Sequence, residues 1–212
     1  MRLELPKLYP ITDARLTGLS HAEQLRRMSD GGATLVQLRE KHLSPREFYG
    51  EVEEALSVAR ARGVRLIVND RADIAFALCA DGVHLGQEDL PPAAARELLG
   101  DQSVIGFSTH NIEQARAAAR LPVSYIAIGP IFPTVSKENP AAVVGIDGLR
   151  RVRAIVGEIP LVAIGGITLE NVEEVFKAGA DSVAVINLLL ASPTEIETRT
   201  MEMLSLTQQT SE

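Results

Sequence analysis

The chain has 212 residues, of which 46% are hydrophobic and 23% charged, and Asp and Glu outnumber Lys and Arg by 28 to 21. This length suffices for one full-sized hydrophobic core, and the composition is that of an ordinary globular protein. The net negative charge disfavours nucleic acid and acidic membrane surfaces as partners, so an anionic ligand would need locally placed cations.

Nothing in the sequence indicates secretion or a membrane span. The amino-terminal segment MRLELPKLYPITD has neither a long apolar region nor a small-residue cleavage site. No apolar run approaches the roughly 18 residues needed to cross a bilayer, so we expect a cytoplasmic protein. The single cysteine, Cys79, lies in the apolar run IAFALCA, which predicts a small buried side chain without a disulfide partner.

Short runs rich in β-branched residues alternate with helical patterns along the chain, which is typical of parallel βα units. Helical segments such as HAEQLRRMSDGG place apolar residues three and four positions apart and end at glycines. Eight strands are predicted, at LYPIT (8–12), TLVQLR (34–39), RLIVN (65–69), GVHLG (82–86), VIGFS (104–108), YIAIG (125–129), PLVAIG (160–165) and SVAVI (182–186).

Eight such units predict one closed (β/α)8 barrel, a TIM barrel, as a single domain over residues 1–212. An open doubly wound sheet is less favoured, because no GxGxxG motif follows the first strand. The longest irregular stretch, PIFPTVSKENPAAVVG (130–145), exceeds an ordinary βα connection and predicts a functional lid after the sixth strand. The polar residues after Leu206 are expected to fray.

Acidic residues follow the third and fourth predicted strands, at Asp70 and Asp89. The carboxyl ends of barrel strands line the active site, and these two strands are neighbours, so the carboxylates could converge on one ion. Mg²⁺ suits this arrangement, because it takes one or two protein carboxylates and leaves other positions for water and substrate phosphate. Each acid could instead cap the helix that follows it, because Asp at an N-cap is common, and spacing alone favours this alternative over a metal site.

Cations are expected at the same rim, at Arg39, Lys41 and Lys137, although each alone could be a solvated loop residue. The three residues together would give an anion a local positive field.

A phosphate site is predicted in the segment AIGGITLEN, after the seventh strand. The loops after strands seven and eight usually bind phosphate in these barrels, and Gly165 and Gly166 would let backbone N–H groups approach the anion. Thr168 is the expected cap of the next helix. Among the histidines only His110, after the fifth strand, is a candidate for a direct role. The absence of GxSxG, HExxH and CxxC motifs and of a Cys–His pair argues against covalent and zinc chemistry.

Taken together, these motifs resemble the thiamine phosphate synthase family over essentially the whole chain. The resemblance is carried by YPITD, VQLREK, NDRADIA, ADGVHLGQEDLP, GFSTH, GPIFPTVSK, AIGGIT and GADSVAV, in the family's order. It implies a barrel enzyme that joins 4-amino-2-methyl-5-hydroxymethylpyrimidine diphosphate to 4-methyl-5-(2-hydroxyethyl)thiazole phosphate. The products would be thiamine phosphate and pyrophosphate, with Mg²⁺ as cofactor. These small molecules are the implied partners, and the oligomeric state stays open, a homodimer included.

The resemblance also implies a role for each matching position. The pyrimidine diphosphate would be bound by Gln37, Leu38, Arg39, Glu40, Lys41, Asn69, Ser108 and Lys137, among which Arg39, Lys41 and Lys137 would be catalytic. The metal would be held by Asp70 and Asp89. The thiazole phosphate would be bound by Thr134, Val135, Ser136, Gly165, Gly166, Ile186 and Asn187. The family usually has serine at position 187 and often threonine at position 136, but Asn and Ser can both donate hydrogen bonds to phosphate.

This chemistry needs no covalent nucleophile and no general base, because the thiazole nitrogen already carries a free lone pair. The demanding event is departure of pyrophosphate, which leaves positive charge on carbon and negative charge on the leaving group. Cations in a preorganised site stabilise that negative charge.

Two rival functions are weighed against the synthase. A thiazole tautomerase, which is a related barrel, needs a proton-transferring residue and typically has histidine directly after the glycine of strand six, where this chain has Pro130. A noncatalytic phosphate-binding barrel would keep the Gly-Gly grip but would have no need for a metal beside a leaving group.

Overall fold

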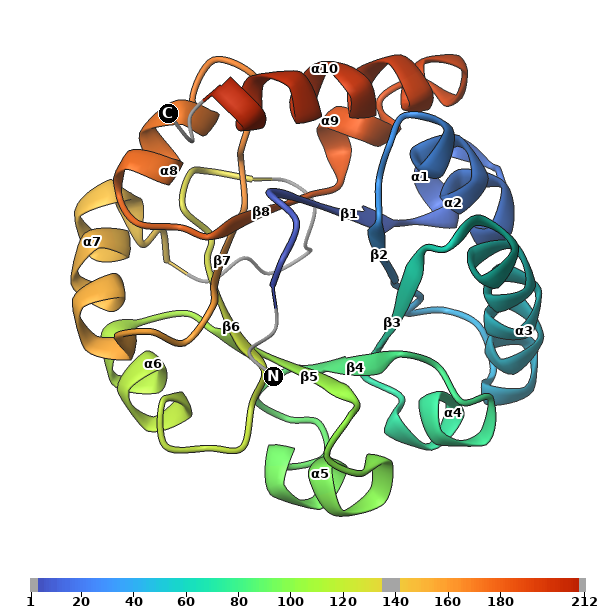
Figure 1. Ribbon diagram of the computed structural model, residues 1–212, viewed down its shortest axis with the longest axis horizontal. Helices are drawn as coiled ribbons and strands as arrows, with labels where there is room; N and C mark the ends of the chain where they lie inside the picture. The colour runs from blue at the N-terminus through green and yellow to red at the C-terminus, as the bar shows by residue number, and fades with distance from the viewer. Residues whose placement is uncertain (1–3, 135–141, 210–212) are drawn as a thin grey trace.

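The computed structural model describes residues 4–134 and 142–209. Eight parallel strands follow one another around a closed barrel, and the last strand pairs with the first (Figure 1). The strands are β1 (Leu8–Thr12), β2 (Leu35–Leu38), β3 (Arg65–Asn69), β4 (Gly82–Leu85), β5 (Val104–Thr109), β6 (Tyr125–Ile128), β7 (Leu161–Ile164) and β8 (Ser182–Val185). The predicted (β/α)8 fold is confirmed, and each predicted strand end lies within one residue of the observed end.

Helices form the outer ring around this barrel (Figure 1). They are α1 (Ala14–Thr17), α2 (His21–Asp30), α3 (Pro45–Arg62), α4 (Ala72–Ala77), α5 (Pro92–Leu99), α6 (Ile112–Ala118), α7 (Gly145–Val156), α8 (Val172–Lys177), α9 (Asn187–Leu190) and α10 (Ile196–Gln209). A 3-10 turn, η1 (Pro193–Glu195), precedes α10. None of the helices within 4–134 and 142–209 is long and apolar enough to cross a membrane.

Local sequence explains where the longest helix begins and ends. Ser44 and Glu47 form a capping box at the start of α3, and Pro45 occupies a first-turn position where no backbone donor is required. Gly63 ends α3 in the left-handed conformation at φ 66°. Buried residues along α3, among them Phe48, face the barrel.

The strands are buried on both faces, so side-chain direction decides what each residue does. Successive residues of a strand point to opposite faces. In β1 and β2, Ile11 pairs with Gln37 and Thr12 with Leu38. Ile11 and Gln37 line the barrel mouth, whereas Thr12 and Leu38, both fully buried, lie in the layer between barrel and helices.

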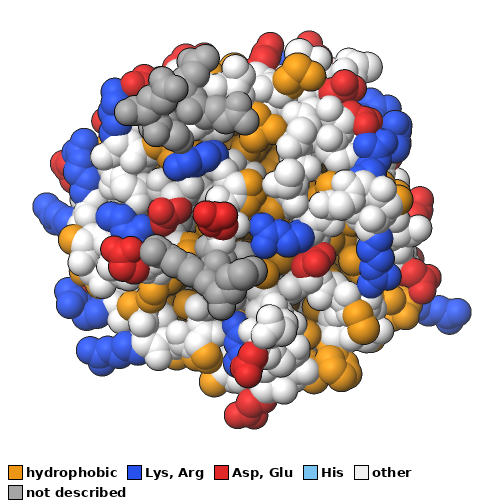
Figure 2. Space-filling view, viewed as in Figure 1, with side chains coloured by type: hydrophobic (Ala, Val, Ile, Leu, Met, Phe, Trp, Pro, Cys, Tyr) orange, Lys and Arg blue, Asp and Glu red, His pale blue; other side chains and the backbone are white. Residues whose placement is uncertain are grey.

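The surface matches the mixed composition of the chain. Figure 2 shows acidic and basic side chains interspersed over the viewed face, with apolar side chains in scattered spots.

One local expectation was wrong. Cys79 is exposed, because α4 ends at Ala77 and Cys79 falls in a turn at φ 52° instead of on an apolar helix face. At the carboxyl terminus α10 continues to Gln209, and the expected fraying stays a prediction because residues 210–212 lie outside the described residues. The centre of the predicted lid, residues 135–141, lies outside the described residues.

Candidate active site

A cavity of about 1230 Å³ opens at the carboxyl ends of the strands. This volume exceeds the range of about 300–1,000 Å³ that is typical of a site for one small ligand. Most of the predicted site residues line it, namely Gln37, Arg39, Lys41, Asn69, Asp70, Asp89, Ser108, Thr134, Gly165, Gly166, Ile186 and Asn187.

Two predicted residues of β2 and its following loop, Leu38 and Glu40, do not line the cavity. Alternation along the chain explains this, since Gln37 and Arg39 point inward and their neighbours point outward. The Leu38 side chain is fully buried on the helix side, and the Glu40 carboxylate contacts His21 instead. Three further predicted residues, Val135, Ser136 and Lys137, lie outside the described part of the chain.

The two predicted metal ligands meet at the rim. Asp70 adopts φ 65°, a left-handed conformation that Asp tolerates better than most residues, and its N–H donates to the His84 carbonyl at 2.8 Å. Burial raises the pKa of Asp70, the Asp89 carboxylate raises it further, and the paired Lys41 ammonium opposes both. A cation bound at this rim would favour the charged form of Asp70.

The alternative reading of these acids as helix caps is wrong. The residues that cap α4 and α5 are Arg71 and Pro91, and neither helix start has a side-chain cap. The Asp89 carboxylate instead accepts a hydrogen bond from the Gly86 N–H at 2.7 Å and closes the loop after β4. Both acids are thus free of helix capping and face the cavity.

The donor set at this rim fits a hard divalent cation that keeps open positions. Within 4–134 and 142–209, no group of three or more His, Cys, Asp and Glu side chains forms a metal cage. Two carboxylates suffice for Mg²⁺, because it usually completes its shell with water and substrate phosphate.

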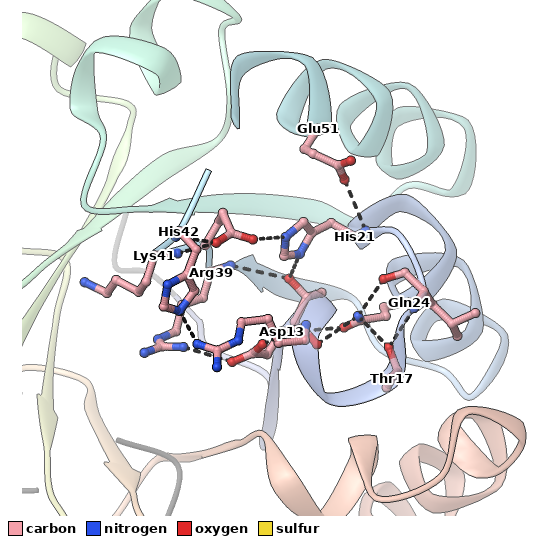
Figure 3. A network of polar contacts seen from close by, with 12 residues as sticks. Asp13, Thr17, His21, Gln24, Arg39, Lys41, His42 and Glu51 are labelled. Atoms are coloured by element: carbon pink, nitrogen blue, oxygen red, sulfur yellow. Dashed lines mark hydrogen bonds and ion pairs between the residues drawn. The ribbon is translucent and has the colours of Figure 1, made fainter. Parts of the chain in front are cut away.

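Two cationic side chains at the rim, Arg39 and Lys41, differ in their exposure to solvent. Arg39 donates to the Asp13 carboxylate at 3.1 Å, and its side chain is only 17% exposed. Lys41 pairs with Asp70 but remains 45% exposed, so an incoming anion can reach its ammonium. Figure 3 shows Asp13, Arg39 and Lys41 within one network of polar contacts.

The floor of the cavity is a hydrogen-bonded chain of buried side chains. Gln37 Nε2 donates to Tyr9 OH at 3.1 Å, and Tyr9 OH contacts Tyr125 OH at 2.9 Å. His84 Nδ1 contacts Tyr125 OH at 2.8 Å, and His84 Nε2 contacts Ser108 Oγ at 2.8 Å. Two predicted pyrimidine contacts, Gln37 and Ser108, are therefore the two ends of one chain.

Ring packing keeps this chain rigid. Tyr9 and Tyr125 meet edge to face at 5.8 Å between centroids, and His84 stacks on Tyr125 at 5.6 Å. A Cβ at Gly106 would overlap the Tyr125 ring, so only glycine permits this approach. Burial raises the pKa of Tyr9 and of Tyr125, so both phenols stay protonated and can donate.

The sequence prediction missed these three floor residues, Tyr9, His84 and Tyr125. A signal was available, because Tyr9 lies two positions before the inward-facing Ile11, and His84 lies two positions before Gly86. Period-two alternation marks such residues as inward-facing.

Two buried polar atoms that face the cavity have no hydrogen-bond partner among the described residues. They are Asn69 Nδ2 and Asn187 Oδ1. Buried polar groups are almost always satisfied, so these two atoms offer hydrogen-bonding capacity to water or to a ligand in the cavity. Asn69 is the last residue of β3, and Asn187 is the first residue of α9, after β8.

Glycine is required in the loop after β7. Gly165 and Gly166 have φ of 102° and 66°. A Cβ on Gly166 would lie 2.6 Å from the Pro133 carbonyl oxygen and 2.7 Å from Phe132 Cβ, so the loop after β6 rests directly on this turn. Backbone bonds from Ile131 to Ile164 at 2.9 Å and from Phe132 to Gly165 at 3.0 Å join the two loops.

Asn171, and not Thr168, organises the end of this loop. The expected Thr168 cap is wrong, because α8 begins only at Val172. The Asn171 side chain accepts from the Thr168 N–H at 2.8 Å and donates to the Gly166 carbonyl at 3.0 Å. It thereby supports the glycine turn from behind.

His110 lines the cavity, but its Nδ1 contacts the Gly129 carbonyl at 2.8 Å. This contact ties the loop after β5 to the end of β6. A direct role in the reaction stays a prediction.

Comparison with known proteins decides the family. A family model described as thiamine monophosphate synthase matches residues 8–189. The chain belongs to this family. A thiamine-phosphate synthase of Chloroflexus aurantiacus is 48% identical over 88% of this chain and 86% of its own length. A thiamine-phosphate synthase of Koribacter versatilis is 47% identical over 95% of this chain and 97% of its own length.

Solved structures agree with the family. Thiamine phosphate pyrophosphorylase from Pyrococcus furiosus superposes with a TM-score of 0.87 at 36% identity, covering 97% of each chain. The resemblance inferred from the motifs is confirmed, and with it the expectation of a transferase of thiamine biosynthesis. In this thiamine monophosphate synthase family member, the cavity at the strand ends is the candidate active site.

Proposed function

We propose that this chain condenses the pyrimidine methyl diphosphate with the thiazole phosphate at the barrel mouth, in a Mg²⁺-dependent reaction that releases pyrophosphate. The observation that carries the proposal is the meeting of Asp70, Asp89 and Lys41 beside a cavity of about 1230 Å³. Opposite charges gathered at one rim suit a metal-bound, multiply charged leaving group.

The pyrimidine ring would lie on the floor of the cavity. There Gln37 and Ser108 present polar groups whose directions are set by the buried chain of phenols and His84. Asn69 Nδ2, buried and unpaired among the described residues, supplies a further donor to this ligand. A ligand aligned in this way would hold its methylene carbon near the rim.

The diphosphate would point toward the two acids and the cations. The Lys41 side chain can exchange its ion pair with Asp70 for one with the leaving group. Arg39 is held in place by Asp13 and presents its guanidinium in a fixed position. Mg²⁺, held by Asp70 and Asp89, would supply charge neutralisation of the leaving pyrophosphate. The resemblance adds Lys137 to these cations, a residue outside the described part of the chain.

The thiazole phosphate would enter from the other side of the mouth. Its phosphate would lie at the turn of Gly165 and Gly166, where both residues have positive φ values and the loop after β6 packs closely against the turn. Backbone N–H groups of such a turn can donate hydrogen bonds to an anion. Thr134, Ile186 and Asn187 line the same side. The thiazole nitrogen then faces the pyrimidine methylene, so binding orients the two reacting atoms.

The assay that tests this proposal mixes the purified protein with both phosphorylated substrates and measures thiamine phosphate and pyrophosphate. We expect equal amounts of both products with Mg²⁺ and none after chelation, with activity restored by added Mg²⁺. Failure to form product with Mg²⁺ present would refute the proposed reaction, and undiminished turnover in chelator would refute the metal requirement.

We also propose a cytoplasmic enzyme, because both substrates are phosphorylated anions that do not cross membranes unaided. A homodimer remains one of the open assemblies, and light scattering would test it.

A further inference from the structure

Behind the cavity wall lies a second polar cluster, between the barrel and α2. His21, the first residue of α2, is fully buried. Its Nε2 lies 3.4 Å from the Glu40 carboxylate, whose side chain is only 8% exposed. Burying a histidine beside an acid costs free energy unless every polar atom has a hydrogen-bond partner.

Each ring nitrogen of His21 has a hydrogen-bond partner. His21 Nδ1 lies 2.7 Å from the Thr12 hydroxyl, and the opposite nitrogen faces the acid. An ionised carboxylate only accepts, so His21 Nε2 carries a proton and donates to Glu40, while Nδ1 shares a hydrogen bond with the Thr12 hydroxyl. Thr12 reaches His21 because it points outward from β1, beside Leu38 of β2.

The other ends of this cluster all hold the loop after β2. The Arg39 N–H donates to Thr12 Oγ1 at 3.4 Å. The N–H groups of Lys41 and His42 both donate to Glu40 Oε1 at 2.6 Å. Three backbone positions of one short loop are thus anchored by Thr12 and Glu40, with His21 joining these two (Figure 3).

The charge on Glu40 is maintained by the same contacts. Burial opposes its ionisation, but the N–H groups of His42 and Lys41, with His21, hold the pKa of the carboxyl below its usual value. Glu40 therefore stays an acceptor for all three partners.

We propose that Thr12, His21 and Glu40 act as positioning residues that fix the loop after β2, so that Arg39 and Lys41 meet the leaving pyrophosphate at set positions. The inference rests on the proposed function, because it takes from it the roles of these two cations. It assigns to Glu40 a role behind the wall in place of a contact with substrate.

Anchoring the loop after β2 lowers the entropic cost of placing its two cations. Arg39 and Lys41 lie on either side of Glu40, so the backbone anchors place both Cα atoms at once. A long cationic side chain on a loose loop must be ordered as the anion binds, and that cost weakens binding. Misplacement by about 1 Å costs up to 100-fold in rate.

The test compares variants by the affinity of the Mg²⁺–pyrophosphate complex, measured calorimetrically, and by KM for each substrate. His21→Leu keeps an apolar side chain of similar bulk and removes both ring hydrogen bonds. We expect weaker pyrophosphate binding and a higher KM for the pyrimidine diphosphate, each by about tenfold, with KM for the thiazole phosphate unchanged. A purely structural role would not separate the two substrates.

The Glu40 side chain gives a second, independent comparison. Glu40→Gln retains an acceptor for the Lys41 and His42 N–H groups, so it should keep most of the pyrophosphate affinity. Glu40→Ala removes the anchor and should lose the affinity as His21→Leu does. Equal affinities in the Gln and Ala variants would overturn the positioning role, even if His21→Leu fails to fold.

Two control variants distinguish the positioning role of His21 from the direct role of Lys41 in pyrophosphate binding. Thr200→Val removes another fully buried side-chain hydrogen bond, from Thr200 to the Ile196 carbonyl on α10, and should lower Tm without changing pyrophosphate affinity. Lys41→Ala should weaken pyrophosphate binding directly. If Lys41→Ala binds pyrophosphate normally, the proposed role of Lys41 fails. If it binds weakly while His21→Leu behaves as Thr200→Val does, only the positioning role fails.

Discussion

The Asp70 and Asp89 carboxylates lie close enough to affect each other's charge, in the loops that follow the neighbouring strands β3 and β4. Burial raises the pKa of Asp70, and the nearby negative charge of Asp89 raises it further against the opposing Lys41. The Asp89 carboxylate also closes the loop after β4 through the Gly86 N–H, but that bond does not require a second acid beside it. The two acids store repulsion that a bound divalent cation would relieve.

Replacing Asp89 should therefore reduce catalysis far more than stability. In Asp89→Asn the amide oxygen can still accept from the Gly86 N–H, so the loop after β4 should keep its shape. Loss of the negative charge should lower kcat about 100-fold or more, as removal of one preorganised electrostatic group does. Steady-state kinetics and thermal unfolding measure the two effects.

The matched control is Asp73→Asn, which removes a surface acid that pairs with Arg71 and has a side chain 63% exposed. Its activity should equal that of the wild type. Wild-type activity in Asp89→Asn would remove Asp89 from the metal site.

The turn at Gly166 should be intolerant of any side chain. Gly166→Ala combines a strained φ of 66° with overlap against Pro133 and Phe132, so the loop after β6 must shift. We expect KM for the thiazole phosphate to rise by about tenfold or more, since misplacement of about 1 Å at a binding group can cost up to 100-fold. KM for the pyrimidine diphosphate should change much less.

Gly63→Ala is the control for backbone strain alone, because Gly63 has the same φ of 66° with open space around it. It should lower stability without affecting either KM. Equal effects of both variants on the thiazole KM would contradict the phosphate role of the glycine turn.

Tyr125→Phe should break the chain on the cavity floor. It leaves His84 Nδ1 without its Tyr125 partner and ends the contact between the two phenols. An unsatisfied buried group costs about 1–3 kcal/mol, so the free energy of unfolding should fall by that amount. Binding of the pyrimidine diphosphate should weaken, because Gln37 and Ser108 lose their common support.

Tyr49→Phe is its partner experiment, because Tyr49 lies on α3 with 38% exposure. Surface substitutions usually change stability by less than about 0.5 kcal/mol. The floor chain would lose its assigned role if Tyr125→Phe were as stable and as active as Tyr49→Phe.

Titration to alkaline pH should test the burial of Tyr9 and Tyr125. The pKa of Tyr9 and of Tyr125 is raised in the folded state, mainly by burial. The stability that the neutral phenols contribute is complete below the unfolded-state pKa of about 10 and is lost as pH rises through the higher folded-state values. In Tyr49→Phe, which retains only these two of the three tyrosines, tyrosinate absorbance should appear together with unfolding. Tyrosinate formation in a protein that is still folded would contradict this prediction.

Much of the site was predictable because it depends on strand order and period. Strand order made convergence of Asp70 and Asp89 one of two possibilities, since consecutive strands are neighbours in a barrel, and the structure brings the two acids together. The glycines after β7 were expected from the usual phosphate site of the fold, and they line the cavity. Glu40 was assigned to the substrate side by motif alone, although alternation from Gln37 already points it outward.

The sequence by itself determined the barrel, the strand ends and the polar rim, because hydrophobic periodicity is local and parallel βα units close in chain order. Only the tertiary structure decided that Tyr9 meets Tyr125, 116 positions away, and that His21 holds the loop that bears Arg39 and Lys41. Such contacts join side chains from separate strands and helices. Their partners follow from the register and packing of the closed barrel, which no local pattern contains.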